Sequence, residues 1–281
     1  MLRVAVPNKG SLSTPALSML AEAGYGQPGN DRELSYVDPE NQTEFFLLRP
    51  RDIAVYVGSG QLDLGITGRD LLLDSGAAAE ELLPLGFGAS TFRYAAPPGV
   101  AGSVTGLAGL RVATAYPGLV AADLARREVD ARVIRLDGAV ENAVRLGVAD
   151  AVADVVSTGT TLRGAGLEVL DEPLLVSEAV LVRRVDAPVD TAVDQLVRRI
   201  QGVLVARSYV LMDYDIRVEL VDAACGLTPG IESPTVSPLH HEGWVAVRAM
   251  VPRGETNRVM DELWELGARG ILVTGIHACR L

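Results

Sequence analysis

The chain has 281 residues, of which 48% are hydrophobic and 29 are glycine. This length exceeds one ordinary hydrophobic core and predicts an α/β protein of two or three domains with many tight turns. The formal net charge of −11 argues against a general nucleic-acid-binding protein, and it means that global charge cannot attract an anionic substrate. A phosphate site must therefore be built locally, from Lys, Arg and backbone amides.

The chain begins with an apolar strand, LRVAVP, that leads into a loop with Lys9 and Gly10. A lysine in a glycine loop at the carboxyl end of a strand is well placed to bind phosphate or pyrophosphate, although it can equally be a solvated surface side chain. No apolar leader segment precedes the strand and no run is long enough to span a membrane. We therefore expect a cytoplasmic protein.

Two cations flank a rigid proline in the segment LLRPRD, just after an apolar run. Arg49 and Arg51 in this position suggest contact with a pyrophosphate or triphosphate, and Arg49 is the stronger candidate. The alternative is an exposed loop at the start of a helix. Asp70 follows the strand GIT, where it either faces a cleft or caps the next helix.

Two segments of the sequence repeat in the same order. LRVA at residues 2–5 recurs at residues 110–113, and Asp63 and Asp150 each follow a glycine by three residues before an apolar strand. The repeat predicts two similar α/β lobes, each with a parallel sheet and crossover helices. Ligands of such folds bind at the carboxyl ends of the strands, in the cleft between the lobes.

We predict that lobe I comprises residues 1–92 and 183–208, and that lobe II comprises residues 93–182. The segment SEAVLVR, residues 177–183, is typical of a strand that returns to lobe I. Apolar residues at helical spacing predict a helix over residues 191–208 that packs on lobe I.

The most informative segment is ENAVRLGVADAVADVVSTGTTL, residues 141–162. Its strand AVADVV ends in a run of small polar residues, which expose several backbone N–H groups at once. We predict a cup for one phosphate group formed by Ser157, Thr158, Gly159, Thr160 and Thr161. Asp154 lies just upstream, within reach of a sugar hydroxyl. Since Ser/Thr/Gly turns are common, the loop alone also fits a buried strand with a polar turn.

From Tyr209 the pattern changes to β-α-β-β-α-β, the order of a ferredoxin-like domain. We predict this third domain over residues 209–281 and expect Trp244 and Trp264 in its core. It is small enough to need support from a neighbour. No spacing of histidines or cysteines indicates a metal site made of protein side chains.

The spacing of Glu141, Gly147, Asp154 and Thr158-Gly159 resembles that of the ATP phosphoribosyltransferase family. LRVAVPNKGSL, EFFLLRPRDIAVYVGSGQLDLGITGRDLL and LTPGIESPTVSPL resemble the same family and extend the resemblance over most of the chain. It implies the long form of the family: two lobes like those of periplasmic binding proteins, which form a cleft, and a C-terminal ferredoxin-like regulatory domain.

The resemblance implies the pentosyltransferase reaction EC 2.4.2.17, the first step of histidine biosynthesis. N1 of ATP attacks C1 of 5-phosphoribosyl 1-pyrophosphate, pyrophosphate leaves, and the anomeric carbon inverts through an oxocarbenium-like transition state. Mg²⁺, arriving with the polyphosphate, would neutralise the leaving group together with Lys9 and Arg49. Glu141, Asp154 and the phosphate loop would hold the sugar. N1 needs no deprotonation, so we expect no general base.

Three further residues enter through the resemblance as contacts of adenine and ribose: Asp70, Ser90 and Tyr116. Tyr116 lies at the same offset in the repeat as Asn8, so it should face the cleft, where its ring can stack on a purine.

The resemblance also implies regulation. Histidine would bind the third domain between subunits as a feedback inhibitor, AMP would be a second inhibitor, and an active dimer would alternate with an inhibited hexamer. The implied histidine site consists of Asp215, Ile231, Ser233, Thr235 and Gly270. Asp215 would pair with the amino group of histidine, whereas the alternative is an ordinary strand and a Gly/Pro turn.

Two other functions fit parts of the pattern. A two-lobed solute-binding protein shares the cleft architecture, but it lacks a reason for the phosphoribosyl-type loop. A noncatalytic regulatory subunit is disfavoured because Lys9, Arg49, Glu141 and Asp154 are all present.

Overall fold

The computed structural model describes residues 1–30, 33–156 and 160–280. They form two compact units, Met1–Ser18 with Tyr25–Val193 and Met19–Gly24 with Asp194–Leu281. No helix in the described part of the chain combines the length and the apolar character needed to cross a membrane.

The first unit contains two sheets, and the first of them has six strands in the order β2-β3-β1-β4-β11-β5. The strands are β1 (Leu2–Pro7), β2 (Ser35–Asp38), β3 (Thr43–Leu48), β4 (Leu64–Gly68), β5 (Ala79–Pro84) and β11 (Ala179–Arg184). The helices of this part are α2 (Pro50–Gly58) and α3 (Arg69–Ser75), together with the first half of α1 (Ser13–Glu22), which belongs to the second unit from Met19 on. Strand β1 is parallel to β3 and β4, whereas β11 is antiparallel to β4.

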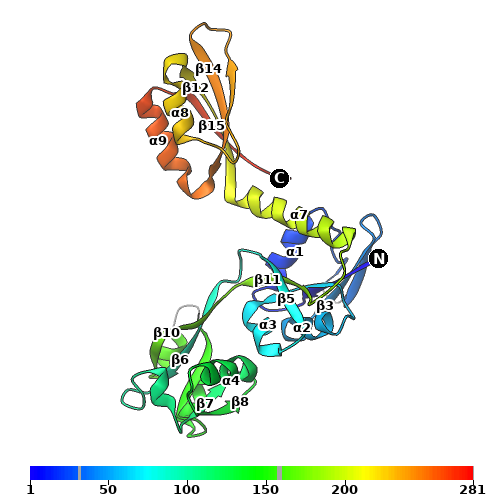
Figure 1. Ribbon diagram of the computed structural model, residues 1–281, viewed down its shortest axis with the longest axis vertical. Helices are drawn as coiled ribbons and strands as arrows, with labels where there is room; N and C mark the ends of the chain where they lie inside the picture. The colour runs from blue at the N-terminus through cyan, green and yellow to red at the C-terminus, as the bar shows by residue number, and fades with distance from the viewer. Residues whose placement is uncertain (31–32, 157–159, 281) are drawn as a thin grey trace. The chain divides into compact units, whose positions relative to one another are not determined.

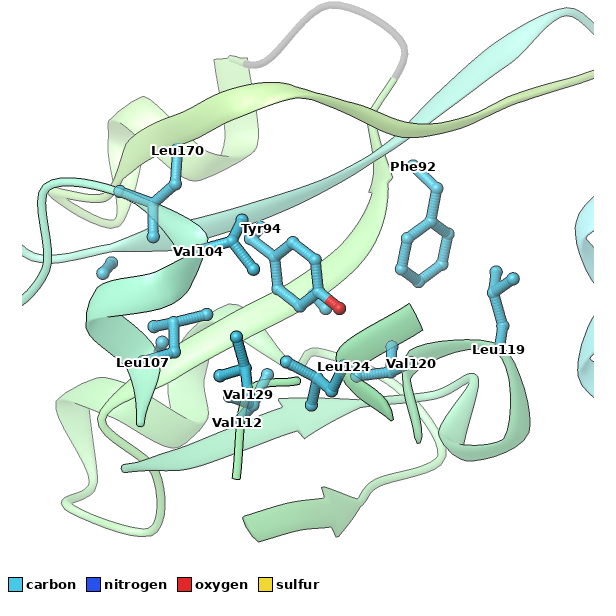
Figure 2. Close-up of a cluster of buried hydrophobic side chains, with 13 residues drawn as sticks. Phe92, Tyr94, Val104, Leu107, Val112, Leu119, Val120, Leu124, Val129 and Leu170 are labelled. Carbon is cyan, nitrogen blue, oxygen red and sulfur yellow. The ribbon is translucent and has the colours of Figure 1, made fainter. Parts of the chain in front are cut away.

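The second sheet has five strands in the order β10-β6-β9-β7-β8. The strands are β6 (Ser90–Ala96), β7 (Arg111–Thr114), β8 (Arg132–Arg135), β9 (Ala151–Val156) and β10 (Glu168–Ser177). The helices are α4 (Pro117–Arg126), α5 (Glu141–Arg145) and α6 (Thr160–Gly164). Figure 2 shows the core, where Phe92 and Tyr94 of β6 lie against α4. The buried Tyr94 hydroxyl donates to Asp123 over 3.0 Å, so its polar end is satisfied.

The predicted repeat is confirmed by the topology. The parallel strands β3-β1-β4 of the first sheet correspond to β8-β7-β9 of the second, and each set is followed by an antiparallel strand, β11 or β6. The two acids of the repeat play the same part: the Arg3 N–H donates to Asp63 Oδ2 over 2.8 Å, and the Arg111 N–H donates to Asp150 Oδ2 over 2.9 Å. Each acid thereby ties the start of its third strand to the first strand of the lobe.

The lobe boundaries move by a few residues. The chain crosses between the sheets in residues 85–89 and again at Glu178, so the predicted boundaries at residues 92 and 183 fall inside β6 and β11. Helix α7 (Thr191–Ser208) forms where the periodicity predicts it, but from Asp194 it belongs to the second unit rather than to lobe I. An apolar run predicts a strand or helix, but not the sheet or body that it joins.

The second unit contains a four-stranded antiparallel sheet in the order β13-β14-β12-β15. Its strands are β12 (Tyr209–Arg217), β13 (Thr235–Pro238), β14 (Trp244–Pro252) and β15 (Arg269–Gly275), and its helices are α8 (Val221–Leu227) and α9 (Thr256–Leu266). Both helices cover the same face of the sheet, so the ferredoxin-like plan is confirmed (Figure 1).

One core prediction for this domain is wrong. Trp264 is 59% exposed, because Val259 and Leu263 provide the buried stripe of α9 and Trp264 lies outside it. The Arg269 guanidinium covers its ring at 4.4 Å. Trp244 is half-buried at the start of β14, with Arg217 at 5.7 Å from the ring centroid.

Candidate active site

A cavity of about 460 Å³ in the first unit is lined by residues of both lobes, among them Lys9, Asp70, Ser90, Tyr116, Ser177 and Glu178. Lys9 follows β1, Asp70 follows β4 and Tyr116 follows β7. These are carboxyl ends of parallel strands, where open α/β folds bind their ligands. The structure thus brings four of the predicted residues together in one cavity: Lys9, Asp70, Ser90 and Tyr116.

Asp70 is held by a network that the sequence did not reveal. It is 7% exposed in the first turn of α3, and the N-cap of that helix is Gly68, so Asp70 does not cap it. Its N–H donates to Ser177 Oγ over 3.1 Å, and the Ser177 hydroxyl donates to Asp70 Oδ1 over 2.9 Å. The Tyr116 hydroxyl donates to the same carboxylate. Asp70 therefore joins lobe I to lobe II and to the end of β10.

The Tyr116 ring is packed on two sides. Phe92 meets it in a T-shaped arrangement with the ring centroids 5.1 Å apart, and the Arg51 guanidinium lies over it at 4.8 Å. Burial, and next the charge of Asp70, raises the pKa of Tyr116. The hydroxyl is thus a neutral donor, and its ring presents an apolar surface at the cavity wall.

The surroundings of Asp154 disfavour its ionised form. Asp154 is half-buried near the end of β9, and burial raises its pKa. The Val155 N–H donates to its Oδ1 over 2.8 Å, which opposes the shift, while the charges of Glu141 and Asp70 reinforce it. A carboxylate kept in such surroundings is a typical functional group.

Glu141 and Arg49 do not line this cavity. Glu141 begins α5 and lines a second cavity of about 500 Å³, with Asn142 and Arg145 beside it. Arg49 is the exposed N-cap residue of α2, and its neighbour Pro50 reaches the main cavity instead.

The predicted phosphate cup falls largely outside the described residues. Ser157, Thr158 and Gly159 lie outside the described residues, as do the side chains of Thr160 and Thr161. On either side of them, β9 ends at Val156 and α6 begins at Thr160. Val155 of β9 lines the cavity.

The two lobes also meet through Asp74 at the end of α3. Its Oδ1 accepts hydrogen bonds from the N–H groups of Gly118 and Leu119, over 2.9 and 3.1 Å, in the first turn of α4. Its Oδ2 pairs with Arg51 at 2.8 Å. A Cβ at Gly118 would lie 2.4 Å from the backbone oxygen of Asp74, so only glycine allows this approach.

Substitution of Gly118 should therefore separate the lobes. We expect Gly118→Ala to lower the free energy of unfolding by about 1–3 kcal/mol, because backbone atoms must move apart to admit the methyl group. Gly254→Ala, where a Cβ would meet no atom within 4 Å, is the matched control. Urea denaturation of both variants checks this. Equal stabilities would show that α3 and α4 can move apart at Gly118 without a loss of stability.

In the C-terminal domain, two of the predicted histidine contacts meet. A Cβ at Gly270 would lie 3.5 Å from Asp215 Oδ2, and Gly270 has a φ of +60°. Thr235 begins β13, while Ile231, 38% exposed, and Ser233 lie in the loop before it. Within the part of the chain that is described, no cluster of three His, Cys, Asp or Glu side chains could hold a metal ion.

Comparisons with known proteins identify a family for the whole length of the chain. The family model "ATP phosphoribosyltransferase" matches residues 49–202, and "HisG, C-terminal domain" matches residues 206–278. The ATP phosphoribosyltransferase of Streptomyces avermitilis is 65% identical over 285 residues and that of Streptomyces coelicolor 66%, with 100% of both chains covered in each case.

One solved structure is also similar, the ATP phosphoribosyl transferase (HisG:HisZ) complex from Thermotoga maritima. It matches with a TM-score of 0.60 and 25% identity over 72% of this chain and 99% of that chain. The full-length matches to catalytic relatives exclude the solute-binding interpretation, which the lobe architecture alone left open.

Proposed function

Because the chain belongs to the ATP phosphoribosyltransferase family, we propose that the cavity of its first unit is the place where the two substrates react. The enzyme joins N1 of ATP to C1 of 5-phosphoribosyl 1-pyrophosphate and releases pyrophosphate, the first step of histidine biosynthesis. The observation that carries the proposal is the convergence of Lys9, Asp70, Ser90 and Tyr116 at strand ends in one cavity.

Adenine would bind against Tyr116. The ring supplies an apolar face, and its hydroxyl is tied to Asp70. Ser90 lines the same cavity and offers a hydroxyl to a sugar or base edge. This arrangement orients N1 without removing a proton from it, because N1 attacks with its own lone pair.

The phosphoribosyl group would lie on the side of Asp154. Its carboxylate can accept hydrogen bonds from ribose hydroxyls, which replace the water lost on burial, and the loop from Ser157 to Thr161 would hold the 5-phosphate. Glu141 is close enough to influence the charge of Asp154, so it would support the same sugar. In the oxocarbenium-like transition state, both carboxylates also stabilise the positive charge at C1.

Charge on the leaving pyrophosphate must be neutralised. Lys9 is exposed and lines the cavity, so it is the first candidate for this task, with Arg49, one residue before the cavity residue Pro50, as the second. We propose that Mg²⁺ also binds here. The side-chain set fits an ion that arrives on the pyrophosphate, with Asp154 as an oxygen ligand at most, and such an ion supplies Lewis-acid neutralisation of the leaving group.

Regulation would reside in the C-terminal domain. Histidine would bind between subunits at Asp215, with Ile231, Ser233, Thr235 and Gly270 around it, and AMP would compete in the cavity of the first unit. Asp215 and Gly270 lie side by side, and the small Gly270 leaves room for a ligand amino group near the carboxylate. The enzyme would alternate between an active dimer and an inhibited hexamer.

Formation of the adenine product tests this function. Purified protein with ATP, phosphoribosyl pyrophosphate, Mg²⁺ and pyrophosphatase should produce a new absorbance band near that of adenine, and histidine should suppress it. Absence of the band would contradict the catalytic assignment, whereas a band that histidine does not affect would contradict only the regulatory one.

A further inference from the structure

Arg51 makes several contacts that have no assigned role in the proposed reaction. It does not line the cavity, yet its guanidinium lies 4.8 Å from the ring centroid of Tyr116, which does. Its side chain is 42% exposed and pairs at 2.8 Å with Asp74, which is only 8% exposed. The residue therefore meets the lining of the cavity at the Tyr116 ring, and its charge also reaches Asp154.

The partner of Arg51 is fixed more firmly than a surface carboxylate. Asp74 Oδ1 accepts hydrogen bonds from the N–H groups of Gly118 and Leu119, so Oδ2 is left to face the guanidinium. An ion pair that is anchored at one end by two backbone groups loses little side-chain freedom when it forms. Arg51 is consequently held in place over the ring.

The ring also packs against the core of the second sheet. Its hydroxyl is tied to Asp70, and Phe92 meets it in a T-shaped contact. A planar cation over one face adds to these contacts and opposes rotation of the ring about its Cβ–Oη axis. With Arg51 in place, only the opposite face can receive a flat ligand.

We propose that Arg51 and Asp74 are positioning residues that fix the plane of Tyr116 and so prepare its free face for the adenine of ATP. The same pair ties α3 to the first turn of α4, which sets the distance between the lobes at which that face is presented. This role replaces the phosphate contact that the sequence suggested for Arg51. It rests on the proposed placement of adenine at Tyr116.

Steady-state kinetics of three single variants test the inference. Arg51→Gln removes the cation, and Asp74→Asn removes the ion pair while its amide oxygen can still accept from Gly118 and Leu119. Both should raise the KM for ATP about threefold to tenfold, the range of a cation–π contact, and leave the KM for phosphoribosyl pyrophosphate and the kcat nearly unchanged. Arg135→Gln is the control, since Arg135 is 67% exposed on β8 and pairs only with Asp137 among the described residues.

A double variant separates a positioning role from a direct one. In a Tyr116→Ala background, Arg51→Gln should cause no further rise in the KM for ATP, because its effect passes through the ring. Additive effects, or a larger rise in the KM for phosphoribosyl pyrophosphate than for ATP, would overturn the inference and make Arg51 a substrate ligand. Unchanged melting temperatures for the Arg51 and Asp74 variants show that the kinetic change is not one of folding.

The same series distinguishes failure of the inference from failure of its premise. If Tyr116→Ala leaves the KM for ATP unchanged, adenine does not bind at Tyr116 and the proposed placement fails. If Tyr116→Ala raises that KM but Arg51→Gln and Asp74→Asn do not, the placement stands and the positioning role is wrong.

Discussion

Asp154→Asn should lower kcat/KM about a hundredfold, the typical loss when a group that orients a reacting substrate is removed. An amide keeps the size of the side chain but loses the charge that holds ribose hydroxyls and stabilises C1 in the transition state. The loss should be larger for kcat/KM with respect to phosphoribosyl pyrophosphate than with respect to ATP. Initial rates at varied concentrations of each substrate measure it, and wild-type kinetics in this variant would contradict the assignment.

The same substitution should stabilise the free protein. Burial raises the pKa of Asp154, so the folded protein binds a proton there more readily than the unfolded chain. Above that raised pKa the ionised carboxylate costs stability, and the cost disappears as the pH falls through it. Asp154→Asn should therefore melt at a higher temperature than the wild type at neutral pH, with the difference shrinking in acid.

A pH profile offers an independent check of this point. Since the ionised form of Asp154 is the one that binds ribose, kcat/KM should fall as the pH drops through the raised pKa. Greater stability with lower activity identifies a site where function opposes stability. A variant that is both less stable and less active would instead show Asp154 to be structural.

Asp215→Asn should weaken inhibition by histidine about tenfold to a hundredfold, because a charged hydrogen bond to the ligand's amino group is lost. The kcat without histidine should not change, since Asp215 lies in the second unit and the cavity in the first. Inhibition curves at fixed substrate concentrations measure the effect.

The same strand offers a matched control. Asp213 lies two residues before Asp215 on β12 and pairs with Arg248 at 2.6 Å, and the Arg248 side chain is 61% exposed. A pair this exposed contributes little, so Asp213→Asn should shift inhibition by less than about twofold. If both variants lose inhibition equally, the effect comes from the charge of the sheet face, and Asp215 is not the histidine ligand.

Local patterns predicted most of this fold. The repeated LRVA strand and the acids Asp63 and Asp150 anticipate two lobes of the same topology, and the two acids make the same hydrogen bond to the start of their lobes. Lys9, Asp70 and Tyr116 were also predictable as cavity residues, because each follows a strand that has a parallel neighbour. The lobe boundaries were less predictable from the sequence, since the pairing of β11 with β4 depends on the register of a returning strand.

The missed residues have a common cause. Ser177 contacts Asp70 across 107 positions of the chain, and Asp74 contacts Gly118 across 44. Neither contact follows from spacing, because each depends on where a strand or helix of one lobe ends relative to the other lobe. Arg51 was recognised as a cation near the site, but its partner Asp74 directs it to the back of Tyr116.

The most direct test of the account is a matrix of initial rates, at varied ATP and phosphoribosyl pyrophosphate, for Tyr116→Ala and Asp154→Asn. We predict opposite selectivity: Tyr116→Ala raises the KM for ATP, and Asp154→Asn lowers kcat/KM chiefly for phosphoribosyl pyrophosphate. The reverse pattern, or equal effects on both substrates in both variants, would contradict the division of the cavity between adenine and phosphoribose.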